Sequence, residues 1–250
     1  MIDSHCHLDA CEPPVAELVG RARAAGVGRL ATVGTDGPSI RHALTAAEDH
    51  DEVVAIVGRH PHETTAFDDV SLEEIERAAA HPHARAIGET GLDYYRDHAP
   101  RADQRRAFEA QLELAARLQL PVVIHTRAAE ADTFALLREH AGSLPAVVMH
   151  CFSAPNRLDE CVEQGYMCSF AGNVTYPKAT DLQAAAREVP DGLLLVETDS
   201  PYLAPQPVRG KPNEPANVTH TARFVAELRG IDYEELERIV DANAERVFGT

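Results

Sequence analysis

Lysine is nearly missing from this chain. Only Lys178 and Lys211 occur among 250 residues, and the 40 acidic residues outnumber the 23 lysines and arginines, which gives a formal net charge of −17. Proteins that grip long nucleic-acid duplexes usually present a basic stripe to the phosphates. The composition therefore argues against tight, processive binding of a polynucleotide. Any attraction for phosphate must come from metal ions and a few local cations.

Long hydrophobic runs and paired-cysteine motifs are missing as well. No apolar run approaches the roughly 20 residues of a transmembrane helix. The first predicted strand begins at Met1 and already carries His5 and His7, which leaves no room for a cleavable signal peptide, so we expect a cytoplasmic protein with no membrane contact. The five cysteines lack C-x-x-C spacing. They are typical of reduced, mostly buried thiols and not of a disulfide frame or a zinc ribbon.

The chain does contain a regular alternation of short apolar runs and helix-length amphipathic segments. The apolar runs, rich in Val, Ile, Leu and Ala, predict eight strands. These are Ile2–His5, Arg29–Gly34, Val53–Gly58, Ala84–Gly88, Pro121–His125, Ala146–His150, Tyr166–Phe170 and Leu193–Glu197. Helices are predicted between them, near Val15–Ala25, Ser39–Asp49, Leu72–Ala80, Ala102–Gln119, Ala129–His140, Asn156–Gln164 and Ala179–Val189.

This alternation predicts the architecture. Strands separated by helices pair in parallel through right-handed crossovers, and nearly continuous apolar strands fit a sheet that is buried on both faces. The length suits one α/β fold: a single (β/α)8 TIM-type barrel with C-terminal helices near 216–228 and 233–248, forming one domain over residues 1–250. An open doubly wound sheet would show the same alternation and is the alternative.

Metal-binding side chains recur at the C-terminal ends of the predicted strands. Six of them follow or close five different strands: His5, His7, Glu89, His125, His150 and Asp199. Each alone has an ordinary explanation, because single histidines at strand ends are commonly structural and an acid there can cap a helix. In a barrel, however, all these ends converge on one rim, where active sites form. The joint occurrence predicts a metal centre.

The ligand types indicate the chemistry. Alternate residues of a strand point the same way, so His5 and His7 can bind one ion together, and Glu89 can offer one oxygen to each of two ions. Imidazole and carboxylate ligands suit two divalent ions of Zn, Mn or Mg. Such a pair polarises a phosphoryl oxygen and activates water. Two ions contribute +4 and Glu89 with Asp199 −2, so a metal-filled rim of about +2 would attract phosphate.

Longer motifs surround these residues. They are Asp3–Asp9, Gly58–His62, Gly88–Tyr95, Pro121–Arg127, His150–Ser153, Gly165–Lys178, Glu197–Pro205 and Asn213–Val218. On these motifs the sequence resembles the TatD family of metal-dependent deoxyribonucleases, within the amidohydrolase-like barrels, over nearly its whole length. The resemblance implies that one ion is held by His5, His7, Glu89 and Asp199, and the second by Glu89, His125 and His150. It also implies exonuclease or endonuclease activity on DNA, in some members on RNA.

Two histidines near the third strand and one acid near the eighth are further candidates. His60 and His62 follow the third strand, where His60 could shuttle a proton and His62 could contact a phosphate; a neutral, hydrogen-bonded loop histidine is the alternative for each. Glu197 lies two residues before Asp199, and we expect it to orient a metal ligand by hydrogen bonding.

Three residues that follow the fourth and fifth strands are candidate substrate contacts. Tyr94 and Tyr95 could stack on a base or a sugar, with core packing as the alternative. Arg127 lies two residues past His125 and could contact a phosphate, or be a solvated surface side chain.

The leading hypothesis is metal-assisted hydrolysis of a phosphodiester in DNA or RNA, at or near a 3′ or single-stranded end. His60 or a ligand carboxylate, Glu89 or Asp199, would handle protons. A metallohydrolase of amide, ester or small phosphoester bonds on the same barrel is the main alternative, which the lysine deficit favours. A non-catalytic interaction protein would require lost ligands, and none is missing. No obligate protein partner is evident.

Overall fold

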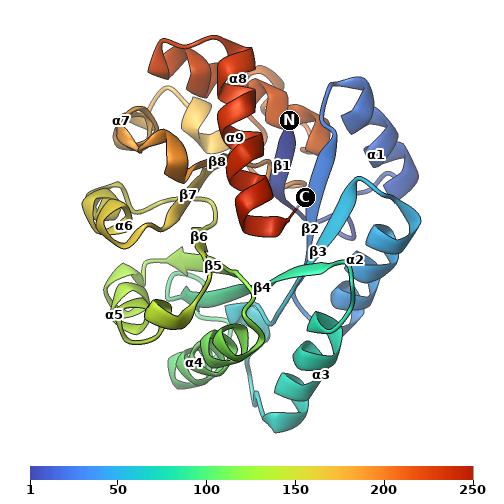
Figure 1. Ribbon diagram of the computed structural model, residues 1–250, viewed down its shortest axis with the longest axis vertical. Coiled ribbons are helices and arrows are strands. Elements are labelled where there is room, and N and C mark those ends of the chain that lie inside the picture. The colour runs from blue at the N-terminus through green and yellow to red at the C-terminus, as the bar shows by residue number, and fades with distance from the viewer. Residues whose placement is uncertain (250) are drawn as a thin grey trace.

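Eight parallel strands follow one another in chain order around the sheet in the computed structural model, which describes residues 1–249 (Figure 1). They are β1 (Ile2–Cys6), β2 (Arg29–Gly34), β3 (Val53–Val57), β4 (Ala84–Asp93), β5 (Val122–Arg127), β6 (Val147–Met149), β7 (Met167–Phe170) and β8 (Leu194–Val196). A bridge between Cys6 and Ser200 joins the β8 end of the sheet to β1. The predicted (β/α)8 barrel is confirmed.

The helices form the outer layer of the barrel (Figure 1). They are α1 (Val15–Ala24), α2 (Gly37–Asp49), α3 (Asp69–Ala79), α4 (Arg101–Leu118), α5 (Glu130–His140), α6 (Leu158–Gln164), α7 (Thr180–Glu188), α8 (Val218–Arg229) and α9 (Tyr233–Phe248). Both predicted C-terminal helices are therefore present. Among the described residues, none of the helices has both the length and the apolar character needed to cross a bilayer. The single domain predicted from the sequence also includes Thr250, which lies outside the described residues.

The core explains why the strands are so uniformly apolar. Every residue of β3 is buried, as are all but the first of β2, because side chains face either the barrel interior or the surrounding helices. α9 lies over the opposite end of the barrel from the strand C-termini. Asn243 on α9 donates hydrogen bonds to the carbonyls of Asp191 and Leu194, just before and at the start of β8. The C-terminal rim thus stays free of this helix.

Two predicted strand ends are wrong, and both concern the site. β4 continues to Asp93 and β5 to Arg127, so Glu89 and His125 lie within strands and not at their ends. Glycine at position 91 allows close contact between the two strands. Gly91 pairs with His125 and has a φ of 142°, and a Cβ at Gly91 would lie 2.0 Å from the His125 carbonyl oxygen.

Candidate metal centre

The Glu89 carboxylate is the centre of a histidine cluster at the C-terminal end of the barrel. Its side chain is buried, and its two oxygens face different groups of histidines. Oε1 lies 2.7 Å from His125 Nδ1 and 3.3 Å from His150 Nε2. Oε2 lies 3.3 Å from His5 Nε2 and 3.7 Å from His7 Nε2. One carboxylate therefore reaches two separate sets of imidazole nitrogens.

Asp199 completes the group on the β1 side. Its Oδ1 lies 3.4 Å from His7 Nε2 and 3.9 Å from His5 Nε2. The residue adopts a φ of 53°, an uncommon conformation for an aspartate that is found mainly where the surrounding structure enforces it. The enforcement is visible here: the Asp199 N–H donates to the His5 carbonyl, and the Asp199 carbonyl accepts from Tyr202.

The six ligands predicted from sequence are thus brought together. In each of three groups of residues, the donor atoms lie within 4.8 Å of one another. The groups are His5 with Glu89 and His150, His5 with His7 and Asp199, and His60 with Glu89 and His125. A mixture of imidazole nitrogens and carboxylate oxygens, buried around one shared carboxylate, fits divalent cations such as Zn²⁺ or Mn²⁺. His60 was expected to act on protons, yet its Nε2 lies 3.6 Å from Glu89 Oε1.

Carboxylates behind two of the histidines fix their orientation. Glu197 Oε1 lies 2.8 Å from His150 Nδ1 and also accepts from the Cys151 N–H. Glu197 was expected to orient a metal ligand, and it lies at contact distance from one. A carboxylate at one ring nitrogen leaves the lone pair of the other nitrogen free, which is the usual arrangement of a histidine that binds metal.

Asp93 is a member of the site that the sequence reasoning missed. Its Oδ2 lies 2.8 Å from His62 Nε2 and 3.3 Å from His125 Nε2, and its Oδ1 accepts the backbone N–H groups of Tyr95 and Arg96. The alternation of a strand contained the signal, because Asp93 lies four residues after Glu89 on β4 and so shares its face. It was overlooked because β4 was expected to stop at Gly88.

The cluster has strongly perturbed protonation. Burial disfavours a charged Glu89, but the neighbouring His150, His60 and His125 outweigh burial and hold the pKa of this carboxyl well below its usual value. Burial likewise opposes a charge on His150, yet Glu197 and Glu89 raise its pKa well above the ordinary value. For His60 burial prevails and its pKa is well below normal, so this ring is neutral.

The structure also revises the charge of the centre. Two divalent ions would contribute +4, but Asp93 and Glu197 join Glu89 and Asp199, so the carboxylates contribute −4 and the sum is about zero rather than +2. The carboxylates that orient His125 and His150 therefore cancel the surplus charge that the sequence suggested. Attraction for a phosphate must come from open coordination positions and from cations on the rim.

The predicted substrate contacts lie around this centre. His62 is partly exposed beside Asp93. Tyr94 is partly buried, with its hydroxyl donating to Asp132 and the Arg101 guanidinium 4.2 Å from its ring centre. Its neighbour Tyr95 is 65% exposed, and the exposed Arg127 guanidinium lies 4.2 Å from that ring centre. Of the two tyrosines, Tyr95 is the more exposed.

Comparisons with known proteins identify the family. The model of the TatD-related DNase family matches residues 2–249. A relative from Bacillus subtilis, named an uncharacterized metal-dependent hydrolase, is 37% identical over 251 residues, covering 99% of this chain and 98% of its own length. A relative from Musicola paradisiaca, named a 3′-5′ ssDNA/RNA exonuclease, is 40% identical over 238 residues, with 92% and 90% covered.

A solved structure of a TatD homologue also matches the whole chain. The crystal structure of a TatD homologue from Escherichia coli K12 matches with a TM-score of 0.93 and 30% identity, covering 100% of this chain and 98% of its own. The match extends over all eight strands and the helices between them. The chain therefore belongs to the TatD-related DNase family.

Proposed function

We propose that this protein is a metal-dependent phosphodiesterase that cleaves single-stranded DNA or RNA from the 3′ end, and that Glu89 would contribute one oxygen to each of two divalent-ion sites. The observation that carries the proposal is the central carboxylate, whose Oε1 faces His125 and His150 while Oε2 faces His5 and His7. The name of the Musicola paradisiaca relative, a 3′-5′ ssDNA/RNA exonuclease, supports the substrate class.

The side chains divide into two ligand sets. His5, His7 and Asp199 with Glu89 Oε2 would hold one ion, and Glu89 Oε1, His125 and His150 the other. When bound, the ions supply Lewis-acid activation of a phosphoryl oxygen and of the attacking water. Asp199 would accept a proton from the attacking water, since it is the less enclosed of the two candidate ligand carboxylates. Glu197 and Asp93 keep His150 and His125 in place.

A hydrogen bond assigns His60 a different role. The backbone N–H of His62 donates to His60 Nδ1 over 3.1 Å, so Nδ1 is an acceptor and the proton of the neutral ring is on Nε2. A metal ligand needs a lone pair at that same Nε2. His60 is therefore a hydrogen-bond donor to the scissile phosphate and not a third histidine ligand of the second ion.

The rim explains the preference for single strands. With a net charge of −17, most of the surface repels nucleic acid, and attraction is confined to the metal centre and to rim side chains such as Arg127 and Tyr95. An unpaired base can leave its neighbours and stack on Tyr95, whereas a base in a duplex cannot. A flexible 3′ end enters this small region more readily than a stiff duplex.

The test compares metal-loaded protein on a labelled single strand and on the blunt duplex of the same sequence, with and without chelator. We expect stepwise shortening of the single strand from its 3′ end, slow cleavage of the duplex, and no cleavage after metal removal. Equal rates on the two substrates would exclude the end preference. Cleavage of neither would exclude the phosphodiesterase function.

One observation favours a second candidate, a metallohydrolase of amide, ester or small phosphoester bonds. The sum of charges at the loaded centre is about zero, which does not by itself select an anionic substrate. A panel of aminoacyl esters, N-acyl amino acids and phosphotriesters separates the two candidates. Turnover of any of these above the rate on oligonucleotides would favour the second.

A further inference from the structure

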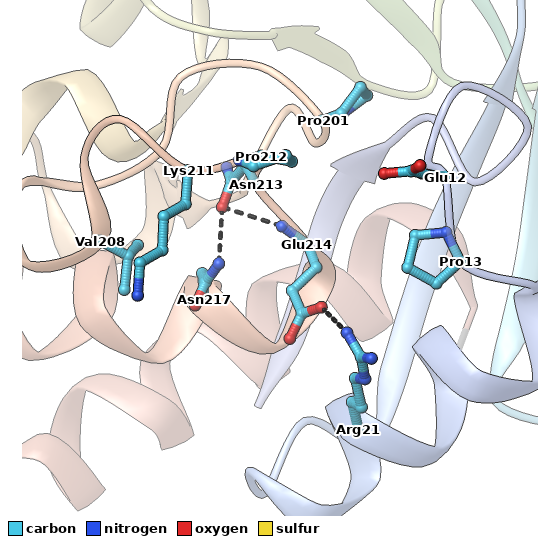
Figure 2. Close-up of a pocket in the computed structure, with 10 residues that line it drawn as sticks. All are labelled: Glu12, Pro13, Arg21, Pro201, Val208, Lys211, Pro212, Asn213, Glu214 and Asn217. Carbon is cyan, nitrogen blue, oxygen red and sulfur yellow. Dashed lines mark hydrogen bonds and ion pairs between the residues drawn. The ribbon is translucent and has the colours of Figure 1, made fainter.

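A cavity of about 360 Å³ opens between the loops that follow β1 and β8 and the side of α1 (Figure 2). Glu12 and Pro13 line it from the loop between β1 and α1, and Pro201 and Lys211 line it from the loop between β8 and α8. Loops that follow barrel strands lie at the C-terminal rim, so the cavity is at the same end of the barrel as the metal ligands. Its volume is in the lower part of the range for pockets that bind small molecules.

Tyr202 lies beside a candidate metal ligand and follows a residue that lines the cavity. Its side chain is 57% exposed, and its ring lies edge-on to the ring of His7, with 6.1 Å between the centroids. The preceding residue, Pro201, lines the cavity. An exposed aromatic ring therefore lies against the candidate ligand His7 and directly follows a residue that lines the cavity, and such a ring can stack on an unpaired base.

The floor of the cavity is rigid. Asn213 is 3% exposed, and its amide nitrogen donates to the carbonyls of Thr198 and Tyr202. Its side-chain oxygen accepts from Asn217, as drawn in Figure 2. These bonds tie the cavity wall to Thr198, the residue before Asp199. A site fixed to the metal centre in this way loses little conformational entropy on binding a ligand.

Lys211 is the free cation of the cavity in Figure 2. Arg21 is paired there with Glu214 and on its own helix with Glu17, whereas no ion pair is drawn to Lys211 among the residues shown. The chain has only one other lysine, Lys178, and it lines a second rim cavity of about 280 Å³ with Ser153 and Asn173. Both lysines of a strongly acidic chain are therefore at the rim.

We propose that the cavity lined by Lys211 is a nucleotide subsite. The base next to the scissile phosphate stacks on Tyr202, and the following phosphate binds Lys211, while the rings of Pro13 and Pro201 give apolar walls. The inference rests on the proposed function and deepens it. The substrate is a strand that extends from the metal centre into this cavity. Stacking involves no hydrogen bonds to the edges of the base, so binding is independent of the nucleotide sequence.

Binding measurements test the subsite without turnover. The probe is a single strand of about eight nucleotides with phosphorothioate linkages, titrated into metal-loaded protein. Tyr202→Ala should raise Kd about tenfold and Tyr202→Phe should leave it unchanged, because the ring and not the hydroxyl stacks. Lys211→Gln should raise Kd about fivefold. Lys178→Gln removes the same charge from the same rim, and we expect about twofold or less.

A photo-crosslink places the strand directly. With 5-iodouracil at successive positions from the 3′ end, Tyr202 should crosslink from one position only, and Tyr95, which follows β4 on another part of the rim, from a different one. No crosslink at Tyr202, or equal Kd values for the two lysine variants, overturns the subsite. Wild-type protein that cleaves single strands in that case retains the proposed function; wild-type protein that neither binds nor cleaves them overturns both proposals.

Discussion

His150 Nδ1 and Glu197 Oε1 lie 2.8 Å apart, both fully enclosed, behind the metal centre. Glu197 also accepts the Cys151 N–H, so the residue after His150 is held by the same oxygen. The contact fixes which nitrogen of His150 faces Glu89, and it makes the imidazole a stronger base toward a cation. It lies outside the ligand set, so it can be altered while all the ligands stay in place.

The first prediction concerns Glu197. Glu197→Gln keeps the size of the side chain but removes its charge, and we expect about 10- to 100-fold weaker binding of the ion held by His150. Competition with a fluorescent chelator measures the affinity. Glu227→Gln, an exposed acid on α8, is the matched control and should behave as the wild type. Unchanged affinity in both variants would show that Glu197 does not support the site.

The second prediction separates His60 from His125. His60→Ala should lower kcat by about two orders of magnitude, the usual loss for one donor that stabilises developing charge, while the metal content stays at the wild-type level. His125→Ala should lose one ion as well as activity. Metal analysis of the purified variants beside single-turnover kinetics makes the comparison. A lower metal content in His60→Ala would instead identify His60 as a ligand.

The third prediction is a pH dependence. Burial opposes protonation of His150, but Glu197 and Glu89 raise its pKa well above the ordinary 6.5 in the metal-free fold. A proton bound more tightly in the folded state stabilises it below the unfolded pKa, and this stabilisation is lost as pH rises through the raised pKa. A divalent ion displaces that proton. The increase in Tm on adding Mn²⁺ should therefore be larger at about pH 8 than at about pH 6.

Thermal unfolding of metal-free and metal-loaded protein at both pH values checks this. The Tm values of the two forms should converge as the pH falls. A Tm increase that does not vary with pH would contradict proton displacement at the cluster.

The fourth prediction concerns Gly91, which lies two residues after Glu89 on β4. Gly91→Ala would place a Cβ 2.0 Å from the His125 carbonyl oxygen in a backbone conformation that side chains rarely adopt. We expect a loss above about 4 kcal/mol in the free energy of unfolding, among the largest for a point mutation. Gly20→Ala within α1 meets no atom within 4 Å and should stabilise by about 0.5–1 kcal/mol. Urea denaturation measures both, and a similar small effect for the two would contradict the strand contact.

The barrel was predictable because its signal is repeated. Eight apolar runs with helices between them specify parallel pairing whatever the exact ends, and most predicted strands agree with the structure to within one or two residues. β4 was the exception. Its glycines indicate a turn by composition, but in three dimensions they serve the close approach of β5 at His125. No local pattern distinguishes these two uses of glycine.

The residues of the candidate site could be predicted only as far as the strand ends could be. Residues that follow apolar strands were brought together as expected, because the barrel collects strand ends at one rim. Asp93 was missed with the end of β4. Tyr94 and Tyr95 are adjacent and chemically alike. Tyr94 is partly buried and contacts Asp132, whereas Tyr95 is exposed. Which of two neighbouring side chains faces solvent depends on tertiary packing, which the sequence pattern does not contain.

The bond between the Asp199 N–H and the His5 carbonyl joins the two ends of the barrel at the site. A chain still emerging from the ribosome has His5 and His7 from the outset, but it cannot surround a cation with them until Asp199 has been synthesised and β8 has joined β1. The group of His5, His7 and Asp199 is therefore complete only when nearly the whole barrel has been synthesised, because its members come from the first and last strands.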